Sequence, residues 1–153
     1  MNTVHLLLVD DEERFLSTTK TLLEKQGIDT TTVTNGFDAL KIMDERAVDV
    51  VILDVKMPGM DGVETLSRIK QKHPLVEVIM LTGHASIESA VEGLKLGAFD
   101  YLVKPCDIPD LLAKIKEAYD KKRVMDEKIR EAKIKAIISH PLAAFEKDKP
   151  EEK

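Results

Sequence analysis

The chain has 153 residues, which is enough for one domain with a full core and a short appendage. Its 43% hydrophobic and 33% charged content is typical of a soluble globular protein, and a net charge of −5 gives no support for nucleic-acid binding, so none is expected. The only cysteine, Cys106, excludes an internal disulfide and fits a reducing compartment. The apolar run at 6–9 is too short for a signal or membrane span, so the sequence predicts a cytoplasmic protein.

A helical pattern follows each of five apolar segments that are typical of strands: 4–9, 28–33, 50–54, 76–81 and 99–103. Residues typical of helix starts precede the last four helices: Asn35, Asp61, Ser86 and Asp107. The fourth helix carries an apolar stripe made of Ile87, Ala90, Val91 and Leu94. Because strands and helices alternate, the sequence predicts an α/β fold with a doubly wound, five-stranded parallel sheet covered on both faces.

The third predicted strand runs directly into a carboxylate. Four large apolar residues at 50–53 indicate a strand buried on both faces, and Asp54 follows them. A charge in that place is poorly hydrated and unfavourable unless a partner compensates it. Taken alone, Asp54 is best interpreted as a residue that caps the following loop.

Polar residues also follow other strands, and the carboxyl ends of parallel strands meet at one edge of a sheet. Asp10 and Asp11 follow the first strand, Thr82 the fourth and Lys104 the fifth. Carboxylates this close repel by about 4 kcal/mol per pair at an effective dielectric near 20, so they need a cation, and oxygen ligands favour Mg²⁺. A bound Mg²⁺ would neutralise an incoming phosphoryl group, and Asp54 could attack it to form an aspartyl phosphate. Lys104 and Thr82 could each hold one phosphoryl oxygen.

Four motifs resemble the receiver domain of bacterial two-component response regulators over residues 3–120: Asp10-Asp11-Glu12, Asp54 with Met57-Pro58-Gly59-Met60-Asp61-Gly62, Thr82-Gly83-His84-Ala85-Ser86, and Phe99-Asp100-Tyr101-Leu102-Val103-Lys104-Pro105. The resemblance implies a flavodoxin-like (βα)5 fold. The third motif is most similar to receivers that precede the ATPase domains of σ54-type activators.

The resemblance also implies roles for single residues. Asp54 matches the phosphoacceptor, with a sensor histidine kinase or a phosphotransfer protein as the donor. The implied Mg²⁺ ligands are Asp11, Asp54 and the Lys56 backbone carbonyl, with Asp10 acting through water. Thr82 and Tyr101 match the switch pair, which reorients on phosphorylation and alters the face of the fourth helix, fifth strand and fifth helix. Lys104 matches the family's lysine, and its bond to Pro105 is expected to be cis.

Two other classes of protein are less consistent with these residues. An aspartate-nucleophile phosphatase of the haloacid-dehalogenase type needs a second Asp two positions after the first, where this chain has Lys56. A flavodoxin-like electron carrier holds a phosphate after its first strand, where the acidic run at 10–13 would repel it. We therefore expect no enzymatic activity beyond self-phosphorylation and slow autodephosphorylation.

The predicted organisation is a receiver domain at 1–120, a helical extension at 121–140 and a disordered tail at 141–153. The residues after the receiver are too few for an ATPase or DNA-reading domain. The simplest interpretation is a stand-alone receiver, and the alternative is a receiver fragment of a larger transcriptional activator.

The last helix is predicted to run from Asp107 to about His140, longer than one small domain needs. A heptad seam continues along it through Met125, Ile129, Ala132 and Ala136, with Lys122 as its charged member. A second copy would cover this seam, so the sequence predicts a homodimer. The alternative is a solvated helix, because alanines bury little area.

Overall fold

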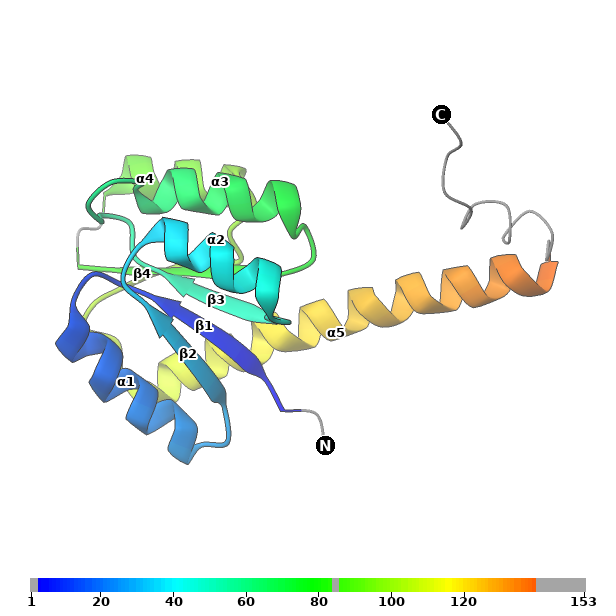
Figure 1. Cartoon of the computed structure of the whole chain (residues 1–153), viewed down its shortest axis with the longest axis horizontal. Helices are drawn as coiled ribbons and strands as arrows, with labels where there is room; N and C mark the ends of the chain where they lie inside the picture. The colour runs from blue at the N-terminus through cyan, green and yellow to red at the C-terminus, as the bar shows by residue number, and fades with distance from the viewer. Residues whose placement is uncertain (1–2, 84–85, 140–153) are drawn as a thin grey trace. The chain divides into compact units, whose positions relative to one another are not determined.

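The computed structural model describes residues 3–83 and 86–139, and it contains one sheet of five parallel strands in the order β2-β1-β3-β4-β5 (Figure 1). The strands are β1 (His5–Val9), β2 (Asp29–Val33), β3 (Val50–Leu53), β4 (Glu77–Thr82) and β5 (Asp100–Val103). All residues of β3 and β4 are buried, which explains the apolar runs at 50–53 and 78–81. The predicted doubly wound parallel α/β fold is confirmed.

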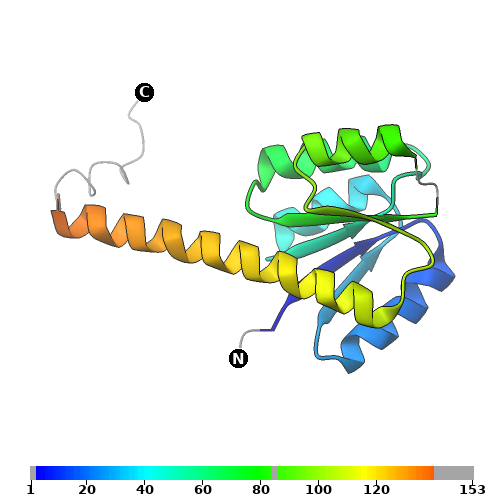
Figure 2. The same ribbon diagram turned by 180° about the vertical axis from the view of Figure 1, so that it is seen from behind.

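In the part of the chain that the structure describes, five helices cover the two faces of the sheet: α1 (Glu13–Lys25), α2 (Gly36–Glu45), α3 (Gly62–Lys72), α4 (Ile87–Lys95) and α5 (Ile108–Ser139). Helices α2, α3 and α4 lie on one face, while α1 and the first turns of α5 lie on the other (Figures 1 and 2). Each face has its own core. The first includes Leu7, Val51, Leu53, Leu66 and Met80, and the second includes Leu8, Ile52, Leu81, Leu111 and Ile115.

Three of the predicted helix starts are N-caps in the structure. The side chains of Asn35, Asp61 and Ser86 each accept a hydrogen bond from a backbone N–H three residues later, at 2.9, 2.8 and 3.1 Å. The apolar stripe of α4, by contrast, does not enter the core, because Ile87, Val91 and Leu94 are exposed. Helix α4 approaches the sheet through Gly93, where a Cβ atom would lie 2.6 Å from the Met80 sulfur.

Two successive lysines of α5, Lys121 and Lys122, make ion pairs at the edge of the sheet where the strands begin, and we call these the amino-edge ion pairs. Lys121 Nζ lies 3.5 Å from Oε2 of Glu77, a buried residue at the start of β4. Lys122 Nζ lies 3.4 Å from Oδ1 of Asp49, which directly precedes β3. These contacts fix α5 against the sheet at the last turn that packs on it.

The chain divides into two units, Met1–Lys122 and Arg123–Lys153, and the division falls inside α5. In the second unit, every described residue from Arg123 to Ser139 is exposed, including Met125 and Ile129. The predicted tail at 141–153 lies outside the described residues. None of the described helices is long and apolar enough to cross a membrane.

The loop between β3 and α3 depends on a close approach at Gly62. The Gly62 N–H donates to the Val55 carbonyl at 2.7 Å, and a Cβ atom at Gly62 would overlap the Asp54 carbonyl oxygen and lie 2.7 Å from Val55 Cα. Backbone atoms of a buried strand end cannot move aside easily. The loop that follows Asp54 therefore requires glycine at this position.

We expect Gly62→Ala to lower the free energy of unfolding by about 2 kcal/mol or more, because the added methyl group overlaps backbone atoms. Gly83→Ala is the matched control, since no described atom lies within 4 Å of its Cβ position and it should change stability far less. Chemical denaturation of both variants checks this. Equal stability of Gly62→Ala and the parent would show that the loop adapts.

Candidate functional site

The sheet brings three carboxylates together at the edge where its strands end. Asp10 and Asp11 follow β1, and Asp54 follows β3, the neighbour of β1 in the sheet. One oxygen from each lies within 4.8 Å of the others. Asp10 and Asp54 are 1% and 3% exposed, whereas Asp11 is exposed and gives the cluster an open side. This set of oxygen ligands with one open side fits a hard divalent cation such as Mg²⁺.

Lys104, which follows β5, supplies a positive charge to the cluster. Its Nζ donates to Asp10 Oδ2 at 2.6 Å and lies 3.6 Å from Glu12 Oε1. Burial acts to lower the Lys104 pKa, but the hydrogen bond and charge of Asp10, with the charges of Asp54 and Glu12, leave this pKa raised above its usual value. Lys104 is therefore firmly cationic at neutral pH.

Asp54 is buried but retains hydrogen bonds to its carboxylate. Its Oδ1 accepts from the Val55 backbone N–H at 2.8 Å, and its side chain is also hydrogen-bonded to Thr82, the last residue of β4. Burial raises the pKa of the Asp54 carboxyl above its usual 3.8, and the charge of Asp10 adds to the rise, while Thr82 and Lys104 oppose it. Without a cation, the ionised form of Asp54 is thus at a disadvantage.

The other predicted site residues lie in different surroundings. Tyr101 is on β5, and its hydroxyl lies within hydrogen-bond distance, 3.0 Å, of Ser89 Oγ of α4. Lys56 lies two residues after Asp54 in the loop that leads to α3, and its side chain is exposed. The peptide bond between Lys104 and Pro105 is cis.

Two neighbours of these residues were not predicted as site residues. Phe15, on α1, places its ring centroid 4.0 Å from Lys104 Nζ. Ser89, the partner of Tyr101, lies on a helix whose sequence carries no sign of this contact. Phe15 and Lys104 lie far apart along the chain, and Ser89 and Tyr101 lie on two consecutive elements joined by a loop. Periodicity within one helix or strand predicts neither contact.

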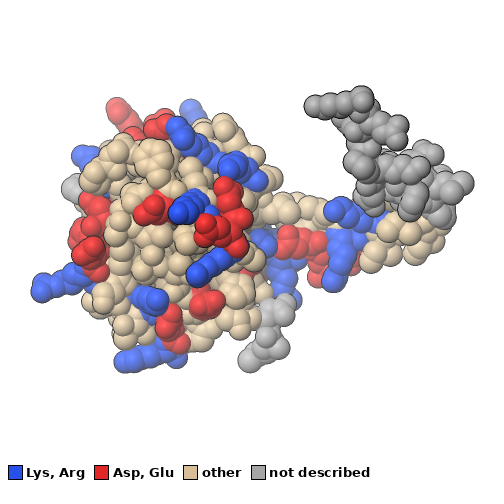
Figure 3. All heavy atoms as spheres, viewed as in Figure 1, with Lys and Arg blue, Asp and Glu red and all other residues tan. Residues whose placement is uncertain are grey.

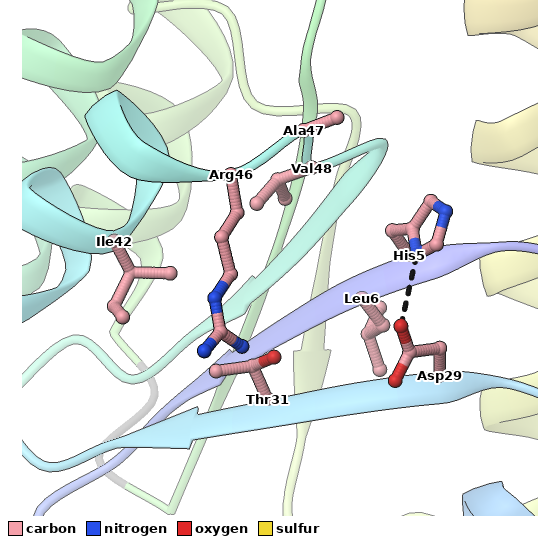
Figure 4. A pocket seen from close by; sticks show the side chains of 8 residues that line it. All are labelled: His5, Leu6, Asp29, Thr31, Ile42, Arg46, Ala47 and Val48. Atoms are coloured by element: carbon pink, nitrogen blue, oxygen red, sulfur yellow. Dashed lines mark hydrogen bonds and ion pairs between the residues drawn. The ribbon is translucent and has the colours of Figure 1, made fainter.

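A separate hollow of about 210 Å³ lies at the opposite edge of the sheet (Figure 4). His5 and Asp29 meet at its rim, with Nδ1 and Oδ2 3.0 Å apart, and the Arg46 side chain extends toward Thr31. It includes none of the predicted site residues. The carboxylate cluster is therefore the stronger candidate for chemistry.

Comparisons with known proteins agree with this geometry. A family model for the response regulator receiver domain matches residues 6–116. The DNA-binding transcriptional regulator NtrC of Escherichia coli (strain K12) is 39% identical over 111 residues, or 72% of this chain and 24% of NtrC. The transcriptional regulatory protein ZraR of Escherichia coli O157:H7 is 37% identical over 123 residues, or 80% of this chain and 28% of ZraR. The chain thus spans about a quarter of the length of these curated relatives.

Among solved structures, a response regulator receiver domain protein from Clostridium thermocellum superposes with a TM-score of 0.76 at 38% identity. The match covers 80% of this chain and 98% of that chain. At this level of identity the similarity extends beyond the shared fold.

We expect Asp54→Asn to raise the free energy of unfolding of the metal-free protein by about 1 kcal/mol at pH 7, because it removes a buried charge beside Asp10. The pKa of Asp54 is higher in the folded protein than its usual 3.8. Ionisation of Asp54 therefore lowers the free energy of unfolding when the pH is above the folded-state pKa, and this loss of stability disappears as the pH falls toward 3.8. The gain from the variant should therefore shrink in acid. Urea unfolding in EDTA across this pH range measures it.

Asp11→Asn serves as a control within the same cluster. Asp11 is exposed, so its replacement should give a smaller gain than Asp54→Asn. A metal-free Asp54→Asn protein less stable than its parent would contradict the crowded-carboxylate description.

Proposed function

This chain belongs to the response regulator receiver family, and from that premise we propose that Asp54 accepts a phosphoryl group from a sensor histidine kinase or phosphotransfer protein in a Mg²⁺-dependent reaction. The observation that carries the proposal is the grouping of Asp54 with Asp10, Asp11, Thr82 and Lys104 at one edge of the sheet. Relatives such as NtrC and ZraR are response regulators of the σ54-activator type, as the sequence motifs indicated.

In the proposed reaction, an Asp54 carboxylate oxygen forms a bond to phosphorus while the bond from phosphorus to the donor nitrogen breaks. The donor histidine leaves with that electron pair. Thr82 and Lys104, both beside Asp54, each donate a hydrogen bond to a phosphoryl oxygen. The family is not one of enzymes in the usual sense, and we assign to this chain only self-phosphorylation and slow autodephosphorylation.

The carboxylate cluster also supports a binding site for the cation. Asp11 and Asp54 are the proposed side-chain ligands, together with the Lys56 carbonyl, and Asp10 acts through water. When bound, Mg²⁺ supplies the positive charge that lets a phosphoryl group approach the carboxylates. Before phosphorylation, Asp10 accepts a hydrogen bond from Lys104 at 2.6 Å, which holds that ammonium next to Asp54.

The proposed output surface is formed by α4, β5 and the start of α5. Tyr101 connects β5 to α4 through its contact with Ser89, so a change at Thr82 and Tyr101 can be transmitted to α4. Ile87 on α4 is 84% exposed, and Val91, Leu94 and Val103 are also exposed. Apolar side chains gathered in this way fit a surface for a protein partner.

A second candidate is that this chain is the receiver part of a longer transcriptional activator, as the greater length of NtrC and ZraR favours. NtrC is named as a DNA-binding regulator, so the relatives give no support to our expectation that nucleic acid is not bound. On the face of the described residues drawn in Figure 3, acidic and basic side chains are interspersed. The mass of the natural polypeptide, measured from its source, separates the two candidates.

We expect acetyl phosphate with Mg²⁺ to add the mass of one phosphoryl group to the protein, because an acyl phosphate can replace the histidine donor. Asp54→Asn should abolish the addition, and EDTA should prevent it in the parent. Asp49→Asn, which changes an aspartate at the other end of β3, should remain competent. Intact-mass spectrometry reads all four samples, and label that persists in Asp54→Asn would overturn the assignment.

We also propose a homodimer formed by the extension predicted at 121–140. Exposed apolar residues recur on one side of this part of α5 at heptad spacing: Met125, Ile129, Ala132 and Ala136. The predicted seam included Lys122, but this residue pairs with Asp49 at 3.4 Å, so the exposed seam begins at Met125. A second copy of the same helix is the proposed cover for it.

Ile129→Asp should convert the dimer to a monomer, because it places a charge in the middle of the seam. Ile134→Asp is the matched control: Ile134 is also exposed but lies about 140° round the helix from Ile129. Light scattering at micromolar concentration, with and without phosphorylation, gives the mass. A parent that is monomeric in both states would exclude this dimer.

A further inference from the structure

Among the described residues, three groups contact the ammonium of Lys104, and one of them is an aromatic ring. Asp10 accepts a hydrogen bond from Nζ at 2.6 Å, Glu12 lies at 3.6 Å, and the Phe15 ring centroid lies 4.0 Å from Nζ. The Lys104 side chain is 15% exposed, so little water reaches it. A cation held this close to a ring face is attracted by the electrons of the ring.

The ring and the two carboxylates attract the Lys104 ammonium in different ways. Asp10 and Glu12 attract the N–H groups of Lys104, and the 65% exposed Glu12 draws them toward solvent. The ring attracts the charge and leaves the N–H groups available to oxygen acceptors. Phe15 can therefore keep its contact while those groups turn from one acceptor to another.

We propose that Phe15 is a positioning residue for phosphorylation: its ring holds the Lys104 ammonium at the site while the N–H groups turn from Asp10 to the phosphoryl oxygens on Asp54. The inference rests on the proposed roles of Asp54 and Lys104. Without the ring, Lys104 pairs more often with Glu12 or with water. Fewer molecules then have the ammonium in place, and phosphorylation slows in proportion.

Phe15 also packs beside the core that α1 and α5 share, so a structural role has to be separated from this one. Phe15→Leu keeps an apolar side chain but removes the ring, whereas Phe15→Tyr keeps the ring. A packing role predicts rates that follow the stability of each variant. The positioning role predicts rates that follow the presence of the ring.

The first measurement is the rate of Asp54 phosphorylation by acetyl phosphate and Mg²⁺ in the full chain. We expect Phe15→Leu to be about two- to fivefold slower than the parent, the factor that a cation–π contact of ordinary strength provides, and Phe15→Tyr to be close to the parent. Thermal melts of each variant monitor folding. If Phe15→Leu is poorly folded, Phe15→Met takes its place with the same expectation.

The second measurement needs neither metal nor donor. Protons above a ring face resonate upfield, so the Lys104 ε-methylene signal in lysine-labelled protein should be shifted upfield in the parent and in Phe15→Tyr. Phe15→Leu should abolish the shift, and Lys104→Arg identifies the signal. This readout is independent of phosphorylation, so it stands even if Asp54 takes no label.

A slow Phe15→Leu protein, a parental Phe15→Tyr protein and a ring-dependent signal together support the proposal. It is overturned if Phe15→Leu phosphorylates at the parental rate, if Phe15→Tyr is as slow as Phe15→Leu, or if the parent lacks the upfield shift. A parent that gains no phosphoryl group would instead refute the proposed function.

Discussion

The contact between Asp10 and Lys104 is the interaction on which the site depends. Asp10 is almost fully buried, and burying a carboxylate is unfavourable unless a group of opposite charge lies close by. Lys104 provides it from 94 residues further along the chain, because the parallel sheet brings the ends of β1 and β5 to the same edge. The strand order thus decides which charges meet.

One ammonium does not balance the cluster. Asp10 takes up much of the Lys104 charge, which leaves Asp54 and Asp11 without a comparable partner among the described side chains. The remaining negative charge explains why the site suits a divalent cation, and the hydrogen bonds of Val55 and Thr82 keep Asp54 oriented meanwhile. Binding and orientation are therefore provided by different parts of the chain.

The sequence alone predicted the sheet and most of the carboxylate cluster, because both follow from the order of the apolar runs. A polar residue after such a run must lie at the strand end, wherever the helices pack. The ends of strands were predicted less accurately. Strand β4 extends to Thr82, one residue beyond the prediction, because the Lys104 N–H donates to the Thr82 carbonyl at 2.9 Å. That bond joins residues that no local pattern connects.

Contacts between distant elements were beyond such reasoning. The ring of Phe15 over Lys104, the pairing of Lys122 with Asp49 and the exposure of the α4 stripe all depend on how helices sit on the sheet. Helical spacing identifies an apolar side of a helix, but it does not show whether the sheet or solvent faces that side. For α4, the side that approaches the sheet was marked by a glycine.

The amino-edge ion pairs have a consequence for how α5 opens. Up to Lys122, α5 packs on the sheet. Hydrogen exchange of its backbone N–H groups in this part therefore requires opening of the receiver core. From Arg123 onward, all described side chains are exposed, and a lone helix frays from its free end. One continuous helix thus contains two classes of exchange protection, and slow exchange beyond Arg123 would be a direct sign that something covers it.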